Sequence, residues 1–343
     1  MRERLVVFFL ALAVVTAFGV GELRHRWAAP LLISEDGFRF VVEQGDSLSK
    51  VVDTLYSAGV LACPHMVTLY GRWTGLDQQI KQGEYLLPQN STAESLLMQL
   101  QRGDVIQYAV TLPEGITLAM ALDILARQKH LTSTLTGPQD ARILELIQPE
   151  SHPEGLFFPD TYSYARGDTD ISILQRAHTA MLAVLDEEWH QRSQPLPYET
   201  PYEALIMASI IERETGLPEE RTRISGVFIR RLQQDMLLQT DPTVIYGLGD
   251  AFDGNLQRSH LTEDSNAYNT YRLTGLPPTP IALPGRAAIH AALHPEAGTA
   301  LYFVARGDGG HIFSDTLGEH NRAVREYQLQ RRKNYRSAPG SSP

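Results

Sequence analysis

The residue best placed for chemistry is Glu214, in the run Ala208-Ser-Ile-Ile-Glu-Arg-Glu-Thr-Gly216. Three apolar residues at helical spacing precede it on one face of a helix, namely Met207, Ile210 and Ile211. Desolvation against this face and the negative end of the helix dipole should both raise the pKa of Glu214. A carboxyl group that stays protonated near neutral pH is suited to acid catalysis. The structural alternative is a helix-terminal residue paired with a nearby arginine.

Glu212 lies two positions earlier and about 200° around the helix, so the two acids cannot face the same pocket. We therefore expect Glu214 to act as the acid and Glu212 to brace the site from the other side. The helix should begin at Thr200, an N-cap followed by Pro201 and by Glu203 in a capping-box pattern. It should end at about Thr215, before Gly216.

Several loops of the C-terminal half are rich in amides, hydroxyls and aromatic rings. These groups form hydrogen bonds with sugar hydroxyls and pack against sugar rings, so the loops indicate a carbohydrate groove. The candidate substrate-binding residues are Glu212, Gln239, Thr240, Asp241, Tyr268, Asn269, Thr270, Tyr271 and His311.

Some of these residues also have a structural interpretation. Asp241, before Pro242, is typical of the N-cap of a short helix over residues 243–246. The run from Tyr268 to Tyr271 is also typical of a turn whose rings pack on the core. His311 follows two glycines and fits a hairpin residue as well as it fits a base.

Other classes of site are not favoured. His290 and His294 have the spacing of metal ligands on a helix, but no third ligand follows at a convincing spacing, so we expect no metal. The chain has no phosphate-binding loop, dinucleotide fingerprint or Gly-x-Ser-x-Gly elbow, and we expect no cofactor. A net charge of -10 argues against nucleic acid as a partner. Cys63 is the single cysteine, so no intramolecular disulfide can form.

The N-terminus indicates a membrane segment. Residues 5–21 form an almost uninterrupted apolar run, near the lower length limit of a spanning helix and just above that of a signal peptide. Arg2 and Arg4 place the N-terminus in the cytoplasm, and Arg24 to Trp27 favour a retained single-pass anchor over a cleaved signal. The rest of the chain would then lie in the periplasm, where the cell wall is the polymer accessible to it.

The patterns predict an α+β fold with a small N-terminal module and a larger catalytic domain. In the module, a strand over 38–42 is followed by a turn and a helix from Leu48 to Gly59, and this order recurs after Tyr85 and after Tyr108. Further helices are expected over 119–128, 171–189, 200–215, 219–234 and 317–332, with a hairpin of strands over 301–305 and 311–313. The expected divisions are a cytoplasmic N-terminus (1–4), a transmembrane helix (5–21), a linker (22–36), the module (37–110), the catalytic domain (111–336) and a disordered tail (337–343).

Ordered motifs give the chain a family resemblance. With the run ending in Glu214, they are Glu154-Gly155, Phe158-Pro-Asp-Thr-Tyr162, Val227-Phe-Ile-Arg-Arg-Leu232, Leu238-Gln-Thr-Asp-Pro-Thr-Val-Ile-Tyr246, Tyr268-Asn-Thr-Tyr271, Gly275-Leu-Pro-Pro278, Leu301-Tyr-Phe-Val304 and Gly310-His311. Through them the chain resembles the YceG-like (MltG) family of endolytic murein transglycosylases. The unit around Gly45-Asp46-Ser47-Leu48 is similar to a LysM peptidoglycan-binding module.

The resemblance implies that Glu214, the second acid of the Glu-x-Glu pair, is catalytic. It also implies cleavage between N-acetylmuramic acid and N-acetylglucosamine within nascent peptidoglycan, without water, to leave a 1,6-anhydro end. The implied partners are glycan strands, the cytoplasmic membrane and wall-synthesis enzymes such as penicillin-binding proteins. Two alternatives stay open at this point: a hydrolytic muramidase, and a non-catalytic wall-binding anchor.

Overall fold

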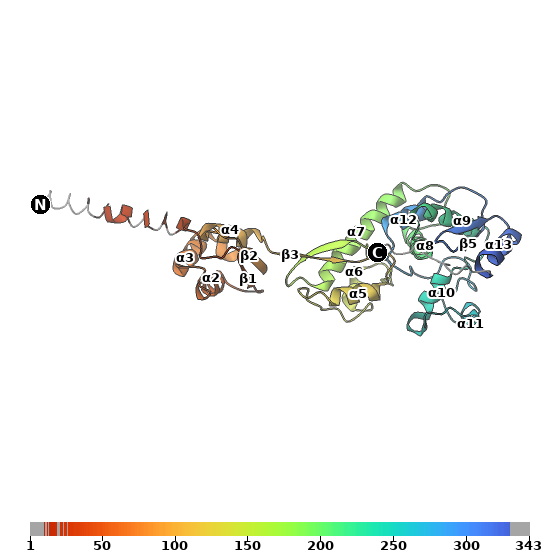
Figure 1. The fold of residues 1–343 in the computed structure, drawn as a ribbon, viewed down its shortest axis with the longest axis horizontal. Coiled ribbons are helices and arrows are strands. Elements are labelled where there is room, and N and C mark those ends of the chain that lie inside the picture. The colour runs from red at the N-terminus through yellow and green to blue at the C-terminus, as the bar shows by residue number, and fades with distance from the viewer. Residues whose placement is uncertain are drawn as a thin grey trace. The chain divides into compact units, whose positions relative to one another are not determined.

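The computed structural model describes residues 27–329, together with residues 10, 12, 14–18, 21–22 and 24–25. The described chain divides into two compact units. The first extends to Ala109 and also includes residues 129–132 and 163–168, which the sequence patterns placed in the catalytic domain. The second contains the remaining residues. Helices and small two-stranded sheets alternate along the chain, which confirms a mixed α+β fold (Figure 1).

Of the residues predicted to form the membrane helix, 5–21, the described ones are 10, 12, 14–18 and 21, and the tail predicted over 337–343 falls wholly outside the described residues. Residues 14–18 are helical and exposed. Within the described residues, no helix has both the length and the apolar character that a membrane crossing requires.

The core of the first unit is formed by the antiparallel pair of β1 and β2 and the helices that pack on it. The strands pair from Phe38 opposite Leu87 to Val42 opposite Gly83. The predicted helix from Leu48 is confirmed, because the Ser47 hydroxyl caps it by accepting a hydrogen bond from the Lys50 amide at 3.3 Å. The elements are β1 (Phe38–Val42), α2 (Leu48–Ser57), α3 (Pro64–Thr74), a 3-10 helix (Leu76–Gln78), β2 (Gly83–Leu87) and α4 (Ala93–Arg102).

The next two strands are β3 (Gln107–Thr111) and β4 (Thr161–Ala165), which pair with each other in a separate sheet. The helices that follow β3 are α5 (Leu118–Ala126), α6 (Ala141–Leu146), α7 (Asp170–His190), α8 (Pro201–Glu214), α9 (Arg221–Gln233), α10 (Asp241–Leu248), α11 (Arg258–Leu261), α12 (Arg286–Leu293) and α13 (Leu317–Val324). The second unit also contains two 3-10 helices (Pro218–Glu220 and Gly249–Ala251), a π-helix (Arg325–Leu329) and the strands β5 (Tyr302–Ala305) and β6 (His311–Ser314).

Helix α8 is the centre of the second unit. Every residue from Ala204 to Ile211 is buried, because α7, α9, α10 and α12 all pack against this helix. The sequence predicted burial along one apolar face of this helix, whereas every side of it is buried between these two residues. At its start, the Thr200 hydroxyl accepts from the Glu203 amide as predicted, but the Glu203 carboxylate accepts from the Glu199 amide, one residue before the expected partner.

The predicted hairpin is confirmed, with Tyr302 opposite Ser314 and Ala305 opposite His311. The helix predicted over 119–128 is confirmed with shifted ends, because the Thr117 hydroxyl caps it and α5 ends at Ala126. The short helix α6 was not predicted, since six residues show too little periodicity to identify.

A tight contact at Gly155 fixes the turn that precedes two buried residues, Leu156 and Phe157. Gly155 has φ +81°, and a Cβ atom there would lie 2.6 Å from Cγ of Pro280 and closer still to its Cβ. Gly275 offers a matched comparison, because it has the same φ of +81° and no heavy atom within 4 Å of the place where a Cβ would lie.

We expect Gly155→Ala to lower the free energy of unfolding by about 1–3 kcal/mol more than Gly275→Ala does. Both variants carry the cost of a side chain at positive φ, and only the first adds an overpacked contact. Urea unfolding followed by circular dichroism measures the difference. Equal unfolding midpoints for the two variants would contradict the tight contact.

Candidate functional site

Glu214 is the last residue of α8, and its carboxyl group meets the loop that leads into α10. The Thr240 hydroxyl donates a hydrogen bond to Oε1 of Glu214. The helix ends there because Thr215 is extended, with φ −142°. The predicted stop at Gly216 thus falls one residue after the observed C-cap.

Burial raises the pKa of Glu214 to about 7. Two neighbours modify this effect in opposite directions: the hydrogen bond from Thr240 lowers the pKa, and the negative charge of Asp241 raises it. A side chain with this pKa holds a proton for much of the time at neutral pH and releases it easily. Glu214 therefore has the properties of a group that can both give and accept a proton.

Two other buried threonines hold Thr240 in place. The Thr240 amide donates to Oγ1 of Thr270 at 3.1 Å, and the Thr243 hydroxyl donates to the Thr240 carbonyl at 2.9 Å. The hydroxyls of Thr243 and Thr270 lie 2.9 Å apart. Two of the predicted site residues, Thr240 and Thr270, are thus brought together from loops 30 positions apart.

Gln239 lies beside this network in an unusual backbone conformation, with φ +54°. Its amide donates to the Thr270 carbonyl at 3.0 Å. The buried guanidinium of Arg231 donates to the carbonyls of Leu237 and Leu238 at 2.9 and 3.0 Å. These contacts offset the cost of a left-handed non-glycine residue and fix the loop before Thr240. Arg231 was not a predicted site residue, because its partners are backbone carbonyls that no sequence motif records.

The prediction that Asp241 is an N-cap is wrong. The N-cap of α10 is Thr240, and Asp241 is the first residue inside the helix. The exposed Asp241 carboxylate instead accepts a hydrogen bond from the Tyr271 hydroxyl at 2.7 Å. The Asp241 carboxylate thus places a negative charge near Glu214. The same hydrogen bond holds the loop of residues 268–271 beside the loop of residues 239–241.

Two other residues of the second loop hold its shape. The fully buried Asn269 donates its amide group to three carbonyls, those of His260, Leu261 and Glu263. The Tyr268 hydroxyl lies 2.8 Å from Oγ1 of Thr279. Hydrogen bonds of Tyr268 and Asn269 therefore hold this turn to the rest of the unit.

Glu212 points away from Glu214, to the start of α12. Its Oε2 accepts from the Gly285 amide at 3.0 Å, and its Oε1 lies 3.4 Å from Nη2 of Arg221. Burial, which raises the pKa of Glu212, outweighs these contacts. Both carboxylate oxygens are engaged, so Glu212 links α8 to α9 and α12.

Another acid with a raised pKa, Glu154, was part of a family motif but was not predicted as a site residue. Burial raises the pKa of Glu154 to about 7, although the Leu118 amide and the Tyr246 hydroxyl donate to its carboxylate at 2.9 and 3.2 Å. Glu154 precedes Gly155 in a loop, where no helical or strand pattern reveals its burial. Tyr246 belongs to α10, so Glu154 is linked to the helix that begins after Thr240.

His311 belongs to a different group of contacts. It is buried at the start of β6, its Nδ1 lies 2.7 Å from Oε2 of Glu220, and its ring meets the ring of Phe303 edge on. The Glu220 carboxylate also accepts from the His311 amide at 2.9 Å. The hairpin interpretation of His311 therefore matches its position in the fold.

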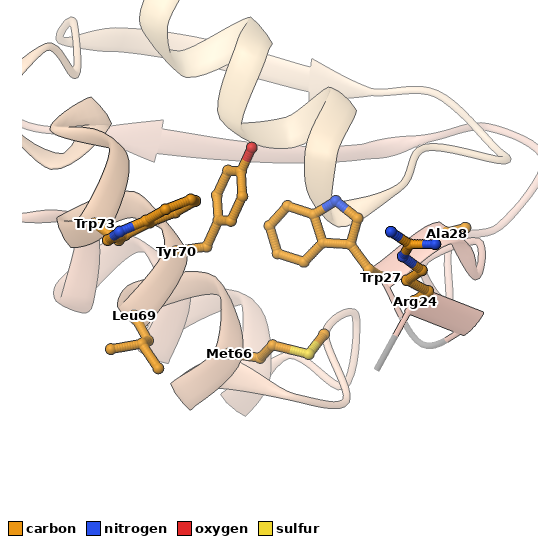
Figure 2. Close-up of a pocket in the computed structure, with 7 residues that line it drawn as sticks. All are labelled: Arg24, Trp27, Ala28, Met66, Leu69, Tyr70 and Trp73. Carbon is orange, nitrogen blue, oxygen red and sulfur yellow. The ribbon is translucent and has the colours of Figure 1, made fainter. Parts of the chain in front are cut away.

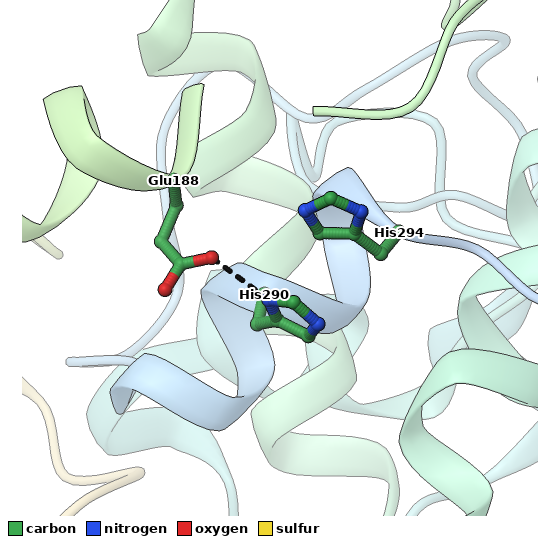
Figure 3. A group of neighbouring side chains, drawn as sticks. All are labelled: Glu188, His290 and His294. Carbon is green, nitrogen blue, oxygen red and sulfur yellow. Dashed lines mark hydrogen bonds and ion pairs between the residues drawn. The ribbon is translucent and has the colours of Figure 1, made fainter. Parts of the chain in front are cut away.

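The pair His290 and His294 gains a potential third metal ligand from α7. The Glu188 carboxylate, 102 positions before His290, lies 2.8 Å from the Nδ1 atom of His290, and the two imidazole rings stack (Figure 3). One ligand atom of each residue lies within 4.8 Å of the others. Glu188 was not considered as a third ligand, because spacing along the chain cannot show a contact between helices; the prediction that no metal binds stays a prediction. Arg286 donates to the other oxygen of Glu188 at 3.0 Å, which favours a structural link between α7 and α12.

Comparison with known proteins places this site in context. The YceG-like family matches residues 40–326. A protein of Bacillus subtilis (strain 168), named endolytic murein transglycosylase, is 30% identical over 304 residues, which is 83% of each chain. A protein of the same name from Streptococcus pneumoniae serotype 2 is 26% identical over 365 residues, and the match spans 95% of this chain and 65% of that relative.

A solved structure also matches. The 2.6 Å crystal structure of a YceG-like protein from Listeria monocytogenes aligns with a TM-score of 0.53 and 27% identity. The alignment covers 84% of this chain and 99% of that one. The likeness therefore extends through most of the described residues.

Two substitutions should move the pKa of Glu214 in opposite directions. Thr240→Val removes the hydrogen bond that lowers the pKa, so the pKa should rise above about 7. Asp241→Asn removes the charge that raises it, so the pKa should fall. The carboxyl carbon of Glu214 can be titrated by NMR after ¹³C labelling of glutamate, with Glu214→Gln used to assign the signal. Shifts of the same sign in both variants would refute this description of the site.

Proposed function

The chain belongs to the YceG-like family, and from this membership we propose that it is an endolytic murein transglycosylase. The proposed reaction cleaves the bond between N-acetylmuramic acid and N-acetylglucosamine within a peptidoglycan strand and leaves a 1,6-anhydro end. The observation that carries this proposal is Glu214, a carboxyl group with a pKa of about 7 held by the Thr240 hydroxyl.

Glu214 serves both halves of the proposed reaction. Its protonated form donates a proton to the glycosidic oxygen as the bond to C1 breaks through an oxocarbenium-like state. The resulting carboxylate then takes the proton from the C6 hydroxyl while O6 bonds to C1 and closes the anhydro ring. The leaving strand keeps the first proton and Glu214 regains one, so no water is consumed.

We assign an electrostatic role to Asp241. Its carboxylate is exposed, accepts a hydrogen bond from the Tyr271 hydroxyl and adds negative potential at Glu214. A negative charge there stabilises the positive charge that develops on the sugar ring in the transition state. It also disfavours the charged form of Glu214 before the reaction, which keeps the acid protonated.

Hydrolysis through two carboxylates is less well supported. That route needs a second acid about 5 Å away for retention, or about 6.5–9.5 Å away for inversion. Glu212 is occupied by the Gly285 amide and Arg221, on another side of α8. Asp241, the other acid considered from the sequence, has a carboxylate exposed to solvent. It is therefore the residue to replace in a test for a second catalytic acid.

The N-terminal part of the chain is proposed to hold the enzyme at the membrane and on the glycan. We propose that residues 5–21 anchor the chain in the cytoplasmic membrane, with the catalytic unit in the periplasm, on the basis of their apolar sequence and flanking arginines. We also propose that residues 37–110 hold glycan as a LysM-like module. The order strand, two helices and strand, with β1 paired to β2, supports a small wall-binding unit.

Replacing the proposed acid should abolish turnover without weakening the fold. We expect Glu214→Gln to reduce cleavage of purified peptidoglycan by about 10²–10⁴-fold or more, because the amide can neither give nor take the proton. Burial raises the pKa of Glu214, so the wild-type fold loses stability as pH rises from about 4.5 to about 7 and the carboxylate becomes charged. The Gln variant lacks this loss and should be at least as stable as the wild type at pH 8.

The matched control is Glu145→Gln, at an exposed position of α6. It should leave both turnover and unfolding unchanged. Normal release of anhydro-ended products by Glu214→Gln would refute the assignment. Lower stability of this variant at pH 8 would instead indicate a structural role for the carboxylate.

The products should identify the reaction. Mass spectrometry should find muropeptides lighter by one water than the hydrolytic products, for both the wild type and Asp241→Asn. We expect the Asp241→Asn variant to be slower by about 10-fold, because it loses one partly screened charge near the reacting ring. Products that contain the added water would establish a muramidase. Loss of all activity in Asp241→Asn would favour a second essential carboxylate.

A further inference from the structure

An apolar, aromatic groove lies on the first unit, on the exposed side of α3. It has a volume of about 720 Å³ and a lining that is almost entirely apolar (Figure 2). We name it the α3 face, and its residues are Arg24, Trp27, Ala28, Met66, Leu69, Tyr70 and Trp73. Trp73 is 83% exposed and Leu69 is 71% exposed, which is unusual for large apolar side chains outside a binding surface.

The aromatic rings of this face attach the incoming chain to α3. The Trp27 ring lies against the Tyr70 ring with centroids 4.4 Å apart, and Tyr70 in turn meets Trp73 edge on at 6.2 Å. Both Trp27 and Tyr70 also pack against the core of the unit. The position at which the chain enters the unit is therefore fixed beside the exposed side chains of Leu69 and Trp73.

The distance along the chain limits where this face can lie. Trp27 lies six positions after Gly21, the end of the apolar run. Six positions span about 9 Å as a helix or about 20 Å when extended. The headgroup region on each side of a bilayer is about 5–8 Å thick. If residues 5–21 cross the membrane, the α3 face must lie at or close to its outer surface.

We propose that the α3 face binds the outer headgroup region of the membrane, with Trp73 and Leu69 inserted among the lipids. Trp and Tyr side chains favour this region because each combines an apolar ring with a polar group. Arg24 adds a positive charge at the edge of the groove, which complements anionic headgroups. This inference rests on the membrane anchor in the proposed function, and it adds a second contact that orients the first unit on the lipid surface.

The test uses the fluorescence of Trp73 in the full chain. The chain has three tryptophans, so Trp27→Phe combined with Trp189→Phe leaves Trp73 as the single reporter. The protein is reconstituted in vesicles of phosphatidylethanolamine and phosphatidylglycerol, with and without bromine on the acyl chains. We expect Trp73 to lose most of its emission in the brominated vesicles, relative to the same protein in vesicles without bromine.

A matched control moves the reporter to another helix of the same unit. Adding Trp73→Phe and Tyr56→Trp to the double variant places a single tryptophan on α2, at a residue that is 54% exposed and outside the α3 face. Its emission should change little with brominated lipid. Circular dichroism spectra matching that of the wild type establish that both proteins are folded.

The outcomes separate this inference from the proposals on which it rests. Vesicle flotation without quenching of Trp73 would overturn the lipid contact and leave the anchor intact. Failure to float with vesicles would overturn both, while the peptidoglycan cleavage assay tests the catalytic proposal separately. A change in Trp73 emission caused by soluble glycan strands, and not by brominated lipid, would also overturn the lipid contact and would identify the α3 face as a glycan-binding surface.

Discussion

The hydrogen bond from Thr240 to Glu214 is the contact on which the site depends. It joins the end of a buried helix to the loop before α10, and so brings together segments 26 positions apart in the sequence. Burial of the carboxyl group favours its neutral form, while the hydroxyl donor favours the charged form. The balance gives one side chain access to both protonation states at neutral pH, which a reaction needing an acid and then a base requires.

The surrounding contacts make this arrangement rigid before substrate arrives. The threonine network fixes the Thr240 hydroxyl, Arg231 fixes the backbone before it, and Glu212 ties the last turn of α8 to its neighbours. Each partner is itself buried or held by backbone groups. A catalytic group supported in this way loses little entropy on reaching its reactive geometry, so binding energy is available for the transition state.

The sequence was informative where local rules decide structure. Helical spacing identified the inward positions of α2, and the cap at Thr200 and the hairpin at 302–314 follow from short patterns. Contacts between distant segments were not accessible in this way. The burial of Glu154, the carbonyl partners of Arg231 and the approach of Glu188 to His290 all depend on tertiary packing. The role of Asp241 was wrongly predicted because Thr240, the residue before it, occupies the N-cap position of α10.

Glu154, which is buried, and Glu214, which is partly buried, also couple folding of the second unit to proton uptake. Each has a pKa of about 7 in the folded chain, against 4.5 as the reference for an exposed glutamate. Near pH 6 each therefore binds close to one more proton when folded than when unfolded, and unfolding releases these protons to the buffer. The measured enthalpy of unfolding will then depend on the ionisation enthalpy of the buffer. Through these two groups, mild acidification of the surroundings favours the folded enzyme, opposite to the usual effect of acid on paired carboxylates.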